Sequence, residues 1–172
     1  EEGTEEDLLP ADPSLAAAAD EIIGIAREIR GEEPVGEALV LDCETGALAM
    51  ALAARTELRL YAVFASEEKA RAAREAFNQA GLHLSRLTAL HLPPGQSLPY
   101  PSRMMDFLFS EGALLSGTLP SDPAELARLQ KPLRGVAVLG GADNSANALP
   151  PWTAATGQED WSIRTGAKGT AW

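Results

Sequence analysis

The chain has 172 residues, of which 45% are hydrophobic but only 5% aromatic, and this predicts one domain with a core built mainly from Ala, Leu and Val. Its 25 acidic residues against 14 basic ones give a net charge of −11, which argues against binding to nucleic acid or anionic lipid, because both need a cationic face. No apolar run reaches the roughly 18 residues of a membrane span, and the single cysteine, Cys43, excludes an intrachain disulfide and a cysteine-based metal cluster.

The amino-terminal end is predicted to be a flexible acidic arm. Five of the first seven residues are Glu or Asp, and residues 1–12 show neither a helical nor a strand period. The chain begins with Glu1 rather than Met. Removal of an export signal and a start inside a longer chain both fit this beginning, and the residues leave the two open.

Residues 13–140 are predicted to form one α/β domain. Helical patterns, several with caps such as Ser66 and the terminating Gly31, occupy 14–30, 47–55, 67–80 and 122–130. Short, almost continuously apolar runs, typical of buried parallel strands, occupy 38–42, 58–64, 86–92, 106–110 and 135–139. This alternation predicts an open, mostly parallel sheet of about five strands with helices on both faces.

The central feature of this pattern is a strand and loop at 38–46 followed by the helix 47–55. An open α/β sheet usually holds a nucleotide-like ligand at such a unit. Here the loop keeps one glycine, Gly46, and carries two acids, Asp42 and Glu44. The small residues that let a backbone approach a ligand are therefore mostly missing.

Other polar residues near strand ends have both a functional and a structural interpretation. Cys43 precedes a helix, which favours a reactive thiol, but the neighbouring acids raise a thiol pKa and favour an inert residue. Ser110 and Glu111 follow a strand at the edge where α/β sites form, and they are the strongest candidates for a functional role. His83 and His91 have no cysteine partner, so no metal site is predicted.

Residues 141–172 contain all three tryptophans, Trp152, Trp161 and Trp172. Pro150 and Pro151 disfavour both helix and strand pairing, so an extended tail that runs along a surface is expected. Bulky aromatics in a chain otherwise poor in them either fold back on the domain or anchor a partner. The residues leave both possibilities open.

The order of motifs resembles a class I S-adenosylmethionine-dependent methyltransferase domain. Residues 40–46 lie where that family has its glycine-rich loop, and 64–71 where it has an acid and then a capped helix. Residues 98–110 are similar to its segment around the fourth strand, and 126–135 to the turn before the fifth. The resemblance implies a Rossmann-like sheet of strand order 3-2-1-4-5. It also implies S-adenosylmethionine as cofactor. The residues that would then lie near the cofactor are Asp42, Cys43, Gly46, Ser110 and Glu111.

The chain departs from that family at three contacts. Asp42 and Glu44 align with the first two loop glycines, and Ala65 aligns with the acid that binds the ribose hydroxyls. The polar position on the adenine side falls in 91–94, which contains no acid. A carboxylate–hydroxyl bond is worth roughly 1.5–3 kcal/mol, so cofactor affinity should fall by orders of magnitude. We therefore expect no catalytic residues, no cofactor and a structural or interaction role. The alternatives are an active methyltransferase with a divergent loop and a domain that senses a small molecule.

A narrower resemblance is to methyltransferase-like domains that precede a quinoprotein-type β-propeller in large exported bacterial proteins. The stretch 81–100 and the residues that follow Trp152 suggest it. This resemblance implies a periplasmic or exported location rather than a cytoplasmic one. It also implies that the partners are other protein subunits or a neighbouring domain of the same chain.

Overall fold

The computed structural model describes residues 13–140, where helices and strands alternate as the sequence predicts. The helices are α1 (Pro13–Arg30), α2 (Ala47–Ala53), α3 (Glu67–Gln79), α4 (Glu111–Ser116) and α5 (Pro123–Leu129). The strands are β1 (Glu37–Leu41), β2 (Arg59–Phe64), β3 (Leu87–His91), β4 (Phe107–Ser110) and β5 (Val136–Val138). Only α4 was not expected, because six residues are too few to show a helical period.

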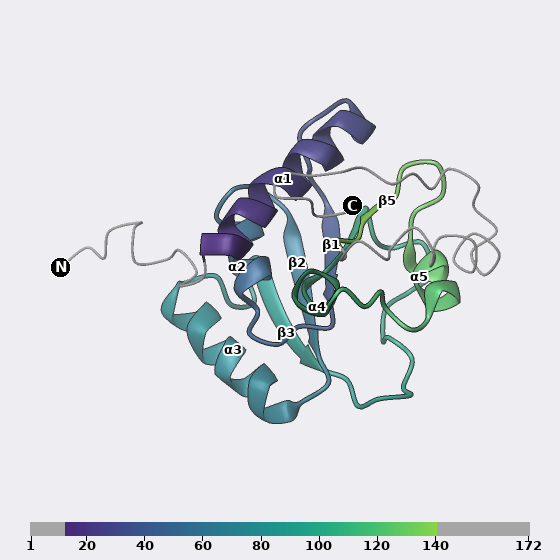
Figure 1. Cartoon of the computed structure of the whole chain (residues 1–172). Coiled ribbons are helices and arrows are strands. Elements are labelled where there is room, and N and C mark those ends of the chain that lie inside the picture. The colour runs from purple at the N-terminus through teal and green to yellow at the C-terminus, as the bar shows by residue number, and fades with distance from the viewer. Residues whose placement is uncertain (1–12, 141–172) are drawn as a thin grey trace.

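The strands form one parallel sheet in the order β3-β2-β1-β4-β5, which confirms the predicted fold class and strand order. Helices α1, α2 and α3 lie together over one face, and α5 lies over the other (Figure 1). Local signals set several boundaries as expected. The Ser66 hydroxyl caps α3 by accepting from the Lys69 N–H, and Gly31, at φ 72°, follows the last residue of α1.

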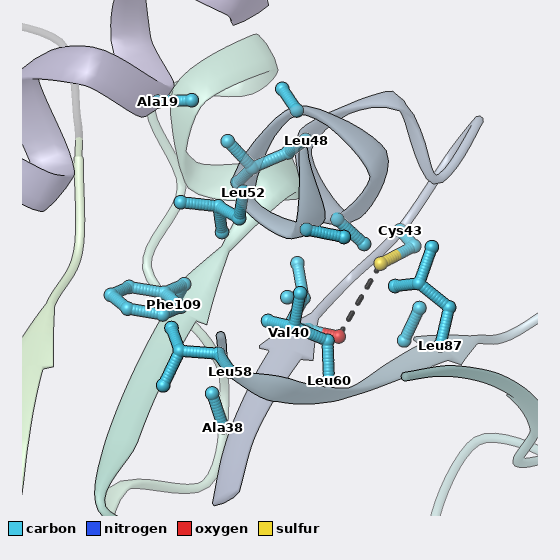
Figure 2. Close-up of a cluster of buried hydrophobic side chains, with 14 of the residues drawn as sticks. Ala19, Ala38, Val40, Cys43, Leu48, Leu52, Leu58, Leu60, Leu87 and Phe109 are labelled. Carbon is cyan, nitrogen blue, oxygen red and sulfur yellow. Dashed lines mark hydrogen bonds between the residues drawn. The ribbon is translucent and has the colours of Figure 1, made fainter. Parts of the chain in front are cut away.

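Each sheet face has its own apolar core, because side chains alternate along a strand. Toward α1–α3 the strands bury Val40, Leu60 and Phe109, which meet Leu48 and Leu52 of α2 (Figure 2). The other face buries a smaller cluster around α5 and the loop before β4, with these fully or almost fully buried members: Leu39, Leu41, Val63, Leu98, Met105, Leu108, Leu126 and Leu129. Ala49, Ala51 and Ala53 of α2 are buried, and their small side chains let that helix pack close to the sheet.

A buried ion pair joins elements at the amino ends of β1 and β4. The Asp106 carboxylate accepts from the Lys131 ammonium at 2.7 Å and from the Glu37 N–H at 3.1 Å. The Arg30 guanidinium lies 3.8 Å from the same carboxylate and 5.2 Å from the centre of the Phe107 ring. The side chains of Arg30 and Asp106 are only 7% and 9% exposed. This cluster ties α1 and the segment before β5 to the sheet, at the edge opposite the candidate site.

The predicted acidic arm at 1–12 and the tail at 141–172, with Trp152, Trp161 and Trp172, lie outside the described residues. Within the described part of the chain, no helix is long and apolar enough to cross a membrane.

Candidate functional site

The candidate site lies at the carboxyl ends of β1, β2 and β4, where open α/β sheets bind ligands. The loop 42–46 leaves β1 there and enters α2 through Gly46, which has a left-handed φ of 81°. A Cβ atom at Gly46 would lie 3.0 Å from the Phe77 ring and 3.2 Å from the Phe64 ring. Gly46 is therefore required by backbone conformation and by packing, independently of any ligand.

The carboxylate of Glu111 fills the hollow formed by this loop. Its Oε1 atom accepts from the backbone N–H groups of Glu44 at 2.9 Å, Thr45 at 2.8 Å and Gly46 at 3.2 Å. The Thr45 hydroxyl donates to the same oxygen at 3.2 Å, and the Leu48 N–H donates to Oε2 at 3.0 Å. Glu111 is fully buried. The backbone N–H groups at the start of α2 and in the loop before it thus find their acceptor in a side chain of the protein itself.

Ser110 and Glu111, predicted to face a ligand, are both engaged within the protein. Ser110 is 1% exposed, and its hydroxyl caps α4 by accepting from the Ala113 N–H at 3.0 Å. The same hydroxyl donates to Asp42 at 3.5 Å. The structure thus brings these residues together with loop 42–46, as the resemblance implies, but Glu111 points into the loop.

Asp42 adopts an uncommon backbone conformation for a residue with a side chain. Its φ is 52°, in the left-handed region that Asp tolerates better than most residues. Gly112 makes this possible, since a Cβ atom there would lie 2.5 Å from the Cβ of Asp42. Desolvation raises the pKa of Asp42 and outweighs the lowering effect of the bond from Ser110. Asp42 alone of the predicted cofactor positions presents an exposed carboxylate at the strand ends.

Cys43 lies in the apolar core on the α1–α3 side of the sheet, where its Sγ donates to the Val40 carbonyl at 3.3 Å (Figure 2). It is 3% exposed. Burial, and then the charge of Glu111, raise the pKa of the thiol well above its ordinary value. The side chain is placed as an inert core residue and not as a nucleophile or a cofactor contact.

Two cavities adjoin the strand ends and share the wall residues Asp42, Pro120 and Ser121. One has a volume of about 330 Å³ and is lined mostly by carbon atoms, from residues that include Val63, Ala65, Leu92, Pro93, Pro94, Leu98 and Leu126. The other has about 370 Å³ and is lined by residues that include Glu44, Gly112, Leu115, Ser116 and Leu119. Of the described residues, no Lys, Arg or His belongs to either wall.

The remaining candidates are spread over the surface and do not converge. Glu44 forms an ion pair with Lys69 of α3. His91, the last residue of β3, lies 2.9 Å from a Glu67 carboxylate oxygen, whereas His83 bridges to Leu87 at the other end of that strand. Among residues 13–140, no three His, Cys, Asp or Glu side chains gather closely enough to hold a metal ion.

Sequence reasoning identified the loop and the residues after β4 but not their connection. The bonds of Glu111 span 63–67 positions, which no local pattern reveals. The available signal was an acid at the carboxyl end of a buried strand, beside the loop of a neighbouring strand.

No known family profile matches the chain, and no curated protein does. Solved structures match in fold. One, from Aquifex aeolicus, is described as a SAM-dependent methyltransferase; it shares 17% identity and a TM-score of 0.70 over 93% of this chain and 90% of its own. Another, from Methanococcus maripaludis, is proposed to be an S-adenosyl-L-methionine-dependent methyltransferase, with 17% identity and a TM-score of 0.69 over 92% and 85%.

A third structure with this fold, SpnF, is described as a [4+2]-cyclase; its identity is 22% and its TM-score 0.53, over 72% of this chain and 44% of its own. At such identities the likeness concerns the fold alone, and one fold hosts several chemistries. The chain therefore has the Rossmann-like α/β fold found in S-adenosylmethionine-dependent methyltransferases.

Proposed function

We propose that this is a methyltransferase-fold domain that does not transfer methyl groups and acts as a structural or interaction module of a larger assembly. The observation that carries the proposal is the position of Glu111. Its carboxylate takes the N–H groups of Glu44, Thr45, Gly46 and Leu48, which are the donors that the loop could otherwise offer to an anionic group of a ligand.

The cavity walls support the same proposal. Ala65 follows β2 and lines the 330 Å³ cavity, but it has no oxygen to accept a bond from a ribose hydroxyl. Phe64, the last residue of β2, is fully buried beside Gly46 and cannot accept one either. Asp42 adds negative charge near the place where the carboxylate of S-adenosylmethionine would be expected. The ribose hydroxyls of that cofactor would lose the acceptor at position 65, and its carboxylate would find no cationic partner in the described walls.

The second candidate function is an S-adenosylmethionine-dependent methyltransferase with a divergent loop. The likeness to solved methyltransferases and the cavities at the strand ends favour it. Under this alternative the cofactor would lie across Asp42 and Ala65, with its flat adenine ring in the 330 Å³ cavity. A domain that has lost catalysis would keep the same fold, so the likeness alone does not decide between the two.

Isothermal titration calorimetry of the full chain with S-adenosylmethionine separates the two candidates. We expect a Kd weaker than about 1 mM, because at least two kinds of contact are missing. S-adenosylhomocysteine should behave in the same way. A micromolar Kd for either compound would contradict the proposal and favour the methyltransferase alternative.

The interaction half of the proposal is supported by Trp152, Trp161 and Trp172, which lie outside the described residues. The full chain and its triple variant, with all three changed to alanine, can be compared for proteins that co-purify with them, and for unfolding in urea. Loss of partners at unchanged stability supports an interaction role. Loss of stability with partners retained would mean that the tryptophans serve the core of the domain itself.

A further inference from the structure

The cavity between the ends of β1, β2 and β3 has the size and lining of a small-molecule site. Its volume of about 330 Å³ lies at the lower end of the range of roughly 300–1,000 Å³ found for ligand pockets. Side chains of Val63, Leu92 and Leu126 and the methyl group of Ala65 contribute apolar surface. Such a lining accommodates a flat apolar ring and offers few bonds to a polar one.

Two carboxylates at this cavity, those of Asp42 and Asp122, have no cationic partner among the described residues. Asp122 accepts from the Glu125 N–H as the cap of α5, whereas the other two acids of the walls are in ion pairs, Glu44 with Lys69 and Glu125 with Arg128. The hydrogen bond found for the Asp42 side chain comes from the Ser110 hydroxyl at 3.5 Å. Asp42 lines both cavities, and its left-handed backbone is held in place beside Gly112. Its charge is therefore fixed where a ligand in either cavity would meet it.

The same walls offer an anion only neutral donors, such as the Gln96 amide and the Ser121 hydroxyl. The nearest backbone donors, in loop 44–48, already bond to Glu111. No Lys, Arg or His from the described residues lines either cavity. A ligand carboxylate placed here would lose part of its hydration, find no cationic partner in the described walls and meet the like charge of Asp42.

We infer that this cavity binds a small cationic molecule that combines a flat apolar group with an amine or sulfonium and carries no carboxylate. The apolar wall takes the flat group, and Asp42 pairs with the cation. This goes beyond the proposed absence of methyl transfer, because it assigns a ligand class to the cleft. S-adenosylmethionine has the flat group and the cations but also the carboxylate, which is the feature that the site disfavours.

Decarboxylated S-adenosylmethionine is the matched probe, since it differs from S-adenosylmethionine only by the missing carboxylate. Calorimetry on the full chain should show that the decarboxylated compound binds at least about tenfold more tightly, because it lacks the one charge that repels Asp42 and both charges are partly exposed to water. In Asp42→Asn the preference should shrink to about equal affinities. Asn tolerates the left-handed backbone as Asp does, so the loop is expected to keep its conformation.

The matched control is Glu75→Gln, which removes the same charge from an exposed position on α3 and should leave the tenfold preference intact. If Asp42→Asn does not fold by circular dichroism, Asp42→Gly, which suits a φ of 52°, takes its place.

Equal affinity of the wild-type chain for the two probes would overturn the inference. So would no binding of either at millimolar concentration, or a preference that survives the loss of Asp42. While S-adenosylmethionine binds more weakly than micromolar, none of these three outcomes contradicts the proposed function. Micromolar binding of S-adenosylmethionine at least as tight as that of the decarboxylated probe would overturn both.

Discussion

The Oε1 atom of Glu111 lies 2.8 Å from the backbone nitrogen of Thr45, although 66 positions separate the two residues in the chain. The bond joins the start of α4, after β4, to the loop after β1, and these two strands are neighbours in the sheet. A loop that could serve a ligand is thereby stabilised from within. The strand order brings this acid to that loop, so the fold itself supplies the acceptor for these N–H groups.

Changing Glu111 to alanine should lower the free energy of unfolding by about 3–5 kcal/mol. Four buried or half-buried N–H groups would lose their acceptor, and each unsatisfied group costs roughly 1–3 kcal/mol before water replaces part of the loss. Glu111→Gln, which keeps one acceptor oxygen, should cost about 2 kcal/mol. Urea unfolding followed by circular dichroism measures both, and Glu75→Gln, on the exposed side of α3, should stay within about 0.5 kcal/mol. A loss below about 1 kcal/mol in Glu111→Ala would show that the loop does not depend on this carboxylate.

Much of the fold could be predicted because its signals are local. Ser66 as a cap and Gly31 as a stop are readable from a few neighbouring residues, and the apolar runs identify buried parallel strands. The strand order 3-2-1-4-5 came from the resemblance and is confirmed. Helix α4 was missed because six residues are too few to show a helical periodicity. Its first residue, Glu111, also bonds to the loop 44–48, which is far away in the sequence.

The candidate site was predictable in place but not in detail. The sequence located Asp42, Gly46, Ser110 and Glu111 at strand ends, and the structure brings them together. It could not tell which acid turns inward. The backbone of Asp42 is left-handed and its side chain is exposed, whereas Glu111 is fully buried. Asp42 packs beside Gly112 and Glu111 bonds to the loop N–H groups, and only the assembled sheet creates these contacts.

At the opposite edge of the sheet, Asp106→Asn should destabilise the domain by about 3 kcal/mol. The substitution leaves the Lys131 ammonium and the Arg30 guanidinium beside a neutral group, and breaking a buried pair from one side costs several kcal/mol. Chemical denaturation measures the change. Asp20→Asn is the control, because its pair with Arg55 is exposed and such pairs contribute about 0–1 kcal/mol. Equal effects of the two substitutions would mean that the buried network is not a special source of stability.

Cys43 should react with a thiol reagent such as DTNB at least about a hundredfold more slowly in the folded protein than in urea. Burial lowers access, and the raised thiol pKa lowers the fraction of reactive thiolate. Because the chain has one cysteine, the absorbance change reports on this residue alone. Reaction within seconds under native conditions would place the thiol at the surface and revive a chemical role for it.

Tyr100 should ionise about two pH units above an ordinary tyrosine. Burial, and then the nearby Tyr61 ring at 5.0 Å, raise the pKa of Tyr100 from 10.0 to about 12. Because the folded state favours the neutral phenol, its contribution to stability is full below pH 10 and is lost as the pH rises through about 12. Absorbance at about 295 nm of the wild-type chain measures the titration, Tyr100→Phe identifies the step that belongs to Tyr100, and circular dichroism at each pH confirms that the fold persists. Half-ionisation near pH 10 in the folded protein would show that Tyr100 is solvated, and the apolar cluster between α5 and the sheet would then be looser than described.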